Sequence, residues 1–163
     1  MQMSQVGLDE ARRAAAVASL NTVLAHVYVL MVKTHKAHWD ITGPRFRALR
    51  ARWDEQYDAL AEAVDALAER VCALGGAPVA TMAGAVTLDA LREEVGSVLN
   101  APQSVEALLQ SHEQAVCALR DCDDGGDPRA AELLRALARQ RQRDARRLRA
   151  FVVDDGAGDA LLA

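Results

Sequence analysis

Apolar residues recur at intervals of three and four along four long stretches of the chain, which is the spacing of amphipathic α-helices. This pattern predicts helices over about 8–39, 44–74, 103–122 and 128–153. The residues D-I-T-G-P at 40–44 end the first helix, because Gly43 permits a turn and Pro44 suits the first turn of the next helix. A pair of glycines at 75–76 ends the second.

The lengths of the connections predict how these helices are arranged. The first two helices are joined by a short turn, and so are the last two, where Asp127 is a candidate N-cap and Pro128 follows it. The connection over 77–102 is long enough to run the length of a bundle, and it contains one short helical piece near 88–99. Short turns join antiparallel neighbours, and one long crossover is the plan of ferritin-like bundles. The sequence therefore predicts an all-α, ferritin-like four-helix bundle with a short extra helix in the crossover between helices two and three.

Composition narrows the class of protein further. Apolar residues make up 51% of the 163 residues but aromatic residues only 4%, so the core of the predicted single domain (1–163, with short flexible tails at about 1–7 and 154–163) is aliphatic. With 26% charged residues and a net charge of −4, the chain is neither a disordered tail nor a broadly basic nucleic-acid binder. Three cysteines without a C-x-x-C pair favour reduced thiols over disulfides or a zinc site. The longest unbroken apolar stretch, 27–32, is too short for a membrane span, and no signal-peptide pattern opens the chain, so we expect a cytoplasmic protein.

A line of carboxylates follows the second predicted helix beside its apolar side. At about 100° per residue, five acids fall within a sector of roughly 80°: Asp54, Asp58, Glu62, Asp65 and Glu69. One interpretation is a solvated face paired with arginines. The other is a metal site, because carboxylate oxygens bind hard cations.

Two histidines near the end of the first helix, His35 and His38, bear on the same choice. Asp65 and Glu69 are one helical turn apart, so they can hold one cation together. An imidazole from another helix would complete a mixed nitrogen and oxygen site that suits iron. The chain contains no Glu-x-x-His motif, which excludes the usual di-iron arrangement inside one subunit.

Several motifs together resemble a known family, the Dps mini-ferritins (DNA-binding proteins from starved cells). They are K-A-H-W-D-I-T-G at 36–43 with Phe46 after it, D-E-x-Y at 54–57, D-x-x-x-E-R-x-x-x-L-G-G at 65–76 and G-D-P-R-A-A-E-L-L at 126–134. The resemblance implies a homo-oligomer, a hollow dodecamer with iron sites at its two-fold interfaces. It also implies oxidation of Fe(II), preferentially by hydrogen peroxide, and storage of the ferric product, which limits oxidative damage.

The resemblance also implies roles for individual residues. His38 corresponds to the family's first ferroxidase histidine, offered by one subunit. Asp65 and Glu69 correspond to the carboxylates offered by the partner, with Glu69 placed to bridge two irons. Asp54 matches an additional acid on the subunit that donates the histidine, and Trp39 matches a tryptophan beside the centre.

One position departs from the family pattern. The second family histidine falls twelve residues after the first, and here that position is Arg50. A guanidinium stays protonated and has no lone pair for iron. We therefore expect non-haem iron at up to two positions per interface site, with His38, Asp65 and Glu69 holding one tightly and the second position impaired. Whether His35 compensates is left open, as is the alternative of a shell with weak oxidation that mainly binds iron.

The resemblance suggests a pore and a DNA-binding role as well. Four acids gather where the third helix gives way to the fourth, in the region that lines acidic three-fold pores in the family: Asp123, Asp124, Asp127 and Glu132. Ordinary capping is the alternative for them. Neither terminal segment (1–10 and 153–163) contains Lys or Arg, and the arginines of the last helix point several ways and have acids to pair with, so a nucleoid DNA-binding protein is possible but not favoured.

Overall fold

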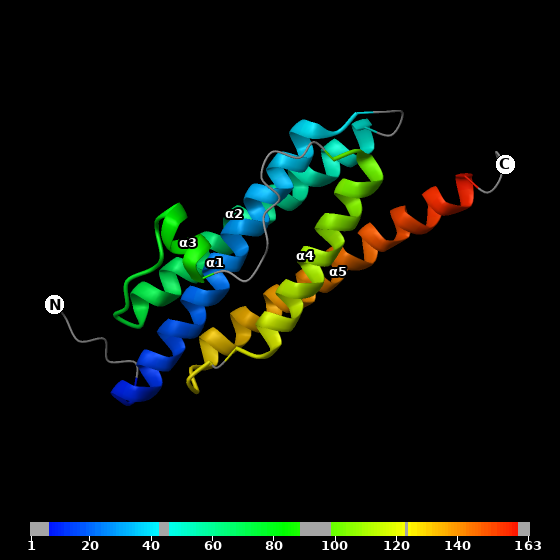
Figure 1. The fold of residues 1–163 in the computed structure, drawn as a ribbon. Helices are drawn as coiled ribbons and strands as arrows, with labels where there is room; N and C mark the ends of the chain where they lie inside the picture. The colour runs from blue at the N-terminus through cyan, green and yellow to red at the C-terminus, as the bar shows by residue number, and fades with distance from the viewer. Residues whose placement is uncertain (1–6, 43–45, 89–98, 123, 160–163) are drawn as a thin grey trace.

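The computed structural model describes residues 7–42, 46–88, 99–122 and 124–159, and within them it contains five helices and no strand (Figure 1). The helices are α1 (Glu10–Asp40), α2 (Phe46–Ala73), α3 (Met82–Leu88), α4 (Ala101–Arg120) and α5 (Pro128–Asp159). The four long helices form a bundle, and α3 lies outside it against α1. The predicted all-α, ferritin-like bundle is therefore confirmed.

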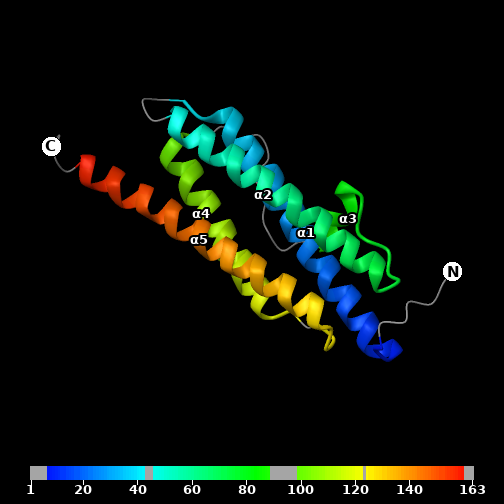
Figure 2. The same cartoon turned by 180° about the vertical axis from the view of Figure 1, so that it is seen from behind.

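The bundle consists of two antiparallel hairpins. Helix α1 packs along α2, and α4 packs along α5, as the short connections predict. The hairpins meet chiefly where α1 touches α4 and where α2 touches α5. Figure 1 shows α1 and α4 in front, and Figure 2 shows α2 and α5 on the opposite side. The exposed faces of α2 and α5 thus look out from the same side of the bundle.

Polar residues define where the helices begin. The carboxylate of Asp9 accepts a hydrogen bond from the main-chain nitrogen of Arg12 at 2.9 Å, which caps α1. Asn100 and Gln103 bond to each other's main-chain nitrogens at the start of α4, a reciprocal capping box. Asp127 accepts from the nitrogen of Ala130 at 3.1 Å, so its predicted role as N-cap of α5 is confirmed.

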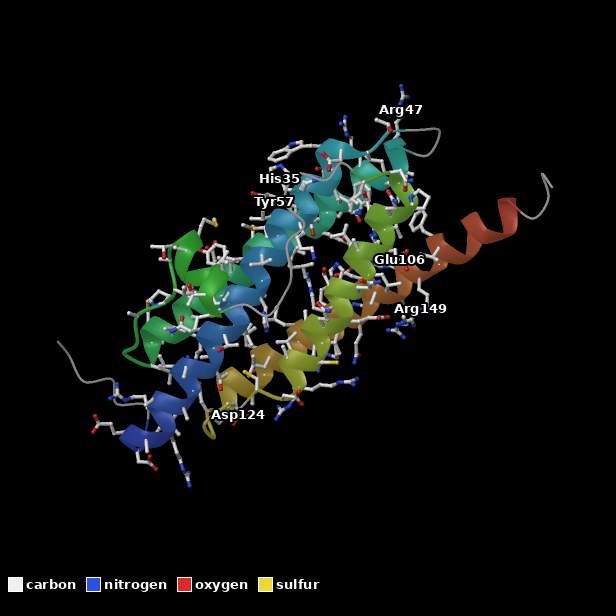
Figure 3. All side chains as sticks on the ribbon, in the orientation of Figure 1. His35, Arg47, Tyr57, Glu106, Asp124 and Arg149 are labelled. Carbon is white, nitrogen blue, oxygen red and sulfur yellow. The ribbon has the colours of Figure 1, made fainter. Side chains whose placement is uncertain are left out.

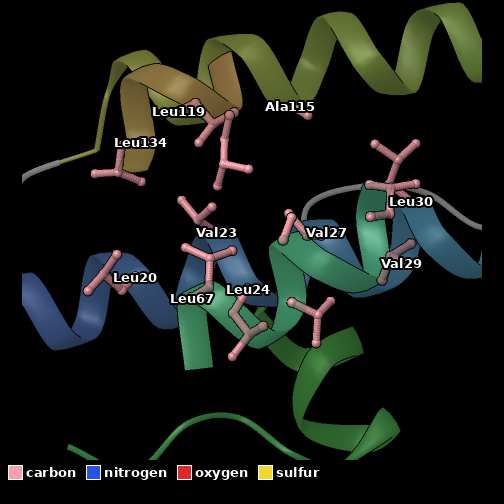
Figure 4. Packing of buried hydrophobic residues seen from close by; sticks show 14 of the residues in the cluster. Leu20, Val23, Leu24, Val27, Val29, Leu30, Leu67, Ala115, Leu119 and Leu134 are labelled. Atoms are coloured by element: carbon pink, nitrogen blue, oxygen red, sulfur yellow. The ribbon is translucent and has the colours of Figure 1, made fainter. Parts of the chain in front are cut away.

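The core is aliphatic, as the composition predicts, and α1 contributes to it on most of its sides (Figure 4). Trp53 is its largest member and is fully buried. The apolar side of α2, beside the predicted line of carboxylates, is buried: Leu49, Trp53, Leu60, Val64, Leu67 and Val71. The acids of the neighbouring sector are exposed. The fold therefore leaves the carboxylate line available to other molecules.

Helix α1 is long and apolar enough to cross a membrane by length and composition, with a mean hydropathy of 1.8 over its most apolar stretch. Half of that stretch is buried inside the bundle, against α2, α3 and α4. Core helices of soluble bundles have the same property, so length and hydropathy alone are weak support for a span.

Asn21 of α1 binds the start of the crossover at two points. The amide nitrogen of Asn21 donates to the main-chain oxygen of Ala77 at 3.0 Å, and its oxygen accepts from the nitrogen of Val79 at 2.8 Å. Both hydrogen-bonding groups of one amide are therefore satisfied by the segment that follows α2. This pairing directs the chain back along α1 toward α3.

The crossover contains a short extra helix as predicted, α3 at Met82–Leu88, and the piece predicted near 88–99 falls almost wholly on 89–98, outside the described residues. Two other predicted boundaries were wrong. Helix α4 begins at Ala101, because Pro102 occupies its first turn instead of breaking the chain. Helix α5 continues to Asp159, through most of the segment predicted as a flexible tail.

Candidate metal centre

The last turns of α1 present three ring-bearing side chains, His35, His38 and Trp39, on one side of the helix. Trp39 is 64% exposed, whereas His35 and His38 are half-buried. The ring of His35 contacts the rings of Trp39 and Tyr57 in tilted arrangements, with centroid distances of 4.1 and 4.4 Å; Figure 3 shows His35 beside Tyr57. Its centroid lies 6.1 Å from that of His38. The contact with Tyr57 therefore packs His35 against α2, beside His38.

Helix α2 reaches His38 at two points. Nδ1 of His38 lies 2.7 Å from Oδ1 of Asp54, within ion-pair distance, although the approach lacks the alignment of a full hydrogen bond. Nε of Arg50 donates to the main-chain oxygen of His38 at 3.2 Å. The structure thus brings together three of the residues singled out from the sequence, His38, Asp54 and Arg50.

Asp65 and Glu69 are exposed on α2, but they lie farther along it. Eleven residues of helix separate Asp54 from Asp65, which is about 16 Å along the axis. Within the described residues, no three His, Cys, Asp or Glu side chains lie close enough together to hold one metal ion. Within one chain, the histidine with Asp54 and the pair of carboxylates therefore lie apart.

The interior of the bundle holds a polar cluster that the sequence analysis did not single out. His112 of α4 and Arg141 and Asp144 of α5 are each at most 1% exposed. Nη2 of Arg141 lies 3.5 Å from Oδ2 of Asp144, and Arg141 lines a small cavity together with His26 and apolar residues. The signal was present in the sequence, because Arg141 and Asp144 stand at apolar positions of the helical period between Leu137 and Leu148, and His112 stands at such a position between Leu108 and Ala115.

This cluster suits neutral and paired groups, and it does not suit a cation. Burial, and then the nearby charge of Arg141, lower the pKa of His112 from 6.5 to about 3. The guanidinium of Arg141 repels any metal ion that approaches His112. The centre of the bundle is therefore not a substitute for the intra-subunit di-iron site that the missing Glu-x-x-His motif already excludes.

The lowered pKa of His112 predicts that the protein loses stability in acid. The unfolded chain binds the proton of His112 near pH 6.5, and the folded chain binds it only near pH 3. The free energy of unfolding is therefore unaffected by this group above pH 6.5, and it decreases as the pH falls from 6.5 toward 3. Between those values the slope is about 1.4 kcal/mol per pH unit. Urea unfolding at several pH values gives the slope of unfolding free energy against pH for the protein and for a His112→Leu variant. The difference between the two slopes is the contribution of His112. Equal slopes for the two proteins would contradict the assignment.

The acids predicted to line a pore have different surroundings. Asp127 is 2% exposed, and its Oδ2 lies 2.6 Å from both Nε and Nη2 of Arg70, so capping and an ion pair occupy this carboxylate within the subunit. Oδ1 of Asp124 accepts from the nitrogen of Gly126 at 2.7 Å within the turn, and Glu132 is exposed. Asp123 lies outside the described residues.

The arginines of α5 also separate into different environments. Arg141 is buried, Arg149 pairs with Glu113 of α4, and Nη1 of Arg147 lies 3.9 Å from Oδ1 of Asp144. Arg135, Arg139, Arg143 and Arg146 are exposed. At 100° per residue these four fall within one sector of about 80°, so the expectation that the arginines point several ways holds only for part of the set.

Known proteins match this chain over most of its length. The family model of the ferritin-like domain matches residues 17–155. The chain is 40% identical to an uncharacterised low temperature-induced protein of Nostoc sp., covering 93% of this chain and 88% of the relative. It is 32% identical to a DNA protection during starvation protein of Brevibacillus brevis, over 82% of this chain and 91% of the relative.

Among solved structures, the Dps protein of Vibrio cholerae O1, described as a member of a broad superfamily of ferritin-like diiron-carboxylate proteins, superposes with a TM-score of 0.85. That pair is 26% identical, and the match covers 93% of this chain and 98% of the other. The helix order, the single long crossover and these matches agree. The chain belongs to the Dps family of ferritin-like proteins.

Proposed function

We propose that this protein is a mini-ferritin that binds and oxidises Fe(II), with hydrogen peroxide as the oxidant, and stores the ferric product in a hollow dodecamer in the cytoplasm. The observation that supports the proposal is that the candidate ligands lie in two separate places on one chain. His38, in contact with Asp54, lies on one part of the surface, and the exposed Asp65 and Glu69 lie on another. A site that one chain leaves in two halves is completed when a second copy supplies the missing half across a two-fold axis.

The donor set accounts for the choice of metal. One imidazole with two or three carboxylates is a mixed nitrogen and oxygen set that suits iron, and it contains no thiolate that would favour zinc. In the completed centre His38 binds Fe(II) from one subunit. Asp65 and Glu69 bind it from the partner, Glu69 is placed to bridge to a second iron, and Trp39 borders the centre.

Arg50 limits the number of irons. Arg50 occupies the position of the family's second histidine, and its positive charge opposes a second cation there. We therefore propose one tightly bound Fe(II) per site. The number matters chemically, because reduction of one H2O2 to two hydroxide ions takes two electrons, and each Fe(II) supplies one in becoming Fe(III). A site that holds one iron must therefore draw the second electron from another Fe(II), and it oxidises iron more slowly than a site that holds two.

Anaerobic titration with Fe(II) tests this proposal. We expect one tight Fe(II) per chain for the protein as it stands, and binding of a second Fe(II) together with faster oxidation by peroxide in an Arg50→His variant. The measurements are bound iron by equilibrium dialysis and oxidation by stopped-flow absorbance. Two tight irons without the substitution, or no gain in the variant, would contradict the role given to Arg50.

A shell that mainly binds iron and oxidises it poorly is the second candidate, and the contact between Arg50 and the main chain of His38 favours it over a fully active centre. Tight binding of Fe(II) by the unaltered protein with little oxidation by peroxide would identify it. DNA binding is the weaker alternative, because several arginines of α5 are buried or paired with acids. Of the acids proposed for a cation pore, Asp124, Asp127 and Glu132 are the described ones that remain candidates.

A further inference from the structure

Two residues of α2 contact His38 at different atoms. Arg50 and Asp54 are four residues apart, so they lie one above the other on the same side of α2. Arg50 donates to the main-chain oxygen of His38, and Asp54 lies beside ring atom Nδ1. Contacts to both the main chain and the ring restrict where the imidazole lies and how it turns.

The contact made by Arg50 is at the end of a helix. The main-chain oxygen of His38 is one of the last four of α1, which have no hydrogen-bond partner inside the helix. The C-terminal end of a helix also carries partial negative charge, which a cation stabilises. The guanidinium of Arg50 therefore satisfies an acceptor and lies where its charge is favourable, and it joins α1 to α2 across the connection between them.

The contact made by Asp54 favours one tautomer of the His38 imidazole. An ionised carboxylate only accepts hydrogen bonds, so it favours the proton on Nδ1 of His38. Nε2 then keeps its lone pair for a metal, which is the arrangement found where a carboxylate orients a metal-binding histidine. Asp54 is 59% exposed and reaches the ring without being buried by it.

We infer that Arg50 and Asp54 are positioning residues, which together present Nε2 of His38 to Fe(II). This inference rests on the proposed function, and it changes the part played by both residues. Asp54 orients a ligand and is not itself required as one. Arg50 opposes a second iron but strengthens the binding of the first, and this opposite sign makes the inference testable.

Substitution of Arg50 separates positioning from charge repulsion. If Arg50 positions His38, Arg50→Met weakens the tight site by about tenfold, which is the loss usual for residues that orient a metal ligand. The affinity of Arg50→Lys, which keeps the positive charge but not the planar guanidinium, lies between that of the unaltered protein and that of Arg50→Met. If Arg50 only repels cations, Arg50→Met binds iron more tightly and Arg50→Lys matches the unaltered protein. Fe(II) and Co(II) are the probes, and the visible spectrum of bound Co(II) reports the imidazole ligand.

Arg52→Met is the matched control, because Arg52 pairs with Glu55 on its own helix at 2.6 Å. We expect its affinity for Co(II) to be unchanged. Tighter or equal binding by Arg50→Met overturns the inference and leaves the proposed function intact. Failure of the unaltered protein to bind either metal overturns the proposed function itself.

A measurement without metal guards against variants that fold poorly. The chain has only four histidines, so solid-state NMR of histidine-labelled apo-protein resolves the ring nitrogens, with His38→Gln for assignment. We expect Nδ1 of His38 to carry the proton, and Asp54→Ala, a change at an exposed position, to give mixed ring forms. A proton on Nε2 in the unaltered protein, or no change in Asp54→Ala, overturns the role of Asp54.

Discussion

An equal mixture of two inactive variants, His38→Ala and Glu69→Ala, is expected to recover about a quarter of the iron sites when the subunits are dissociated and reassembled together. Each variant alone lacks one half of every site and binds no Fe(II) tightly. In a mixed pair, one site receives both substitutions, and the other receives an intact His38 from one subunit and an intact Glu69 from the partner. Random pairing makes half of all pairs mixed, and half of the sites in them are intact.

The result depends on the separation of the two half-sites. If His38 and Glu69 served the same site within one chain, no mixture of the variants would contain an intact site, and recovery would be zero. Peroxide-driven oxidation, measured before and after reassembly, gives the recovered fraction, and particle mass confirms that assembly is complete. Glu62→Ala, which removes another exposed acid of α2, serves as the control and should retain full activity both alone and in mixtures. Zero recovery with normal assembly would contradict a site shared between subunits.

The bundle was predictable because its determinants are local. The helical period, the glycines after α2 and the cap at Asp127 each act within a few residues, and the short turns then define the hairpins. The errors arose where local signals compete. Pro102 looks like a breaker and proves to be an early helix position, and the residues after Val153 continue α5 although their composition resembles a tail.

The sequence singled out the residues of the candidate centre but not the contacts between them. The resemblance gave His38, Asp54 and Arg50, and the contact between His38 and Asp54 agrees with their pairing on one subunit. Arg50 donates to a main-chain oxygen. No pattern of side chains in a sequence predicts such a contact, because every residue has a main-chain oxygen. The roles of Asp65 and Glu69 stay predictions, because a partner subunit has to complete their site.

Asp144→Leu is expected to destabilise the protein by about 3–5 kcal/mol, because it leaves the guanidinium of Arg141 buried without a counter-charge. Arg141 is 1% exposed, and its three side-chain nitrogens make no hydrogen bond within the described residues. Asp144 is its nearest charge, 3.5 Å away, and is itself held by two contacts of 3.2 and 3.3 Å from the amide of Gln140. The pair therefore stabilises the fold mainly because Asp144 compensates the buried charge of Arg141, which would cost more if it were left alone.

Removing both charges together is expected to reverse most of that loss. The double variant Arg141→Met with Asp144→Leu fills similar volume with apolar atoms and removes the desolvation penalty of both ions, so its stability returns to within about 1 kcal/mol of the unaltered protein or exceeds it. Urea unfolding at one fixed protein concentration measures the cycle, because assembly makes apparent stability depend on concentration. Arg139→Met, at an exposed position of the same helix, should change stability by less than about 0.5 kcal/mol. If the double variant is as unstable as Asp144→Leu alone, the penalty comes from lost packing and not from the unpaired guanidinium.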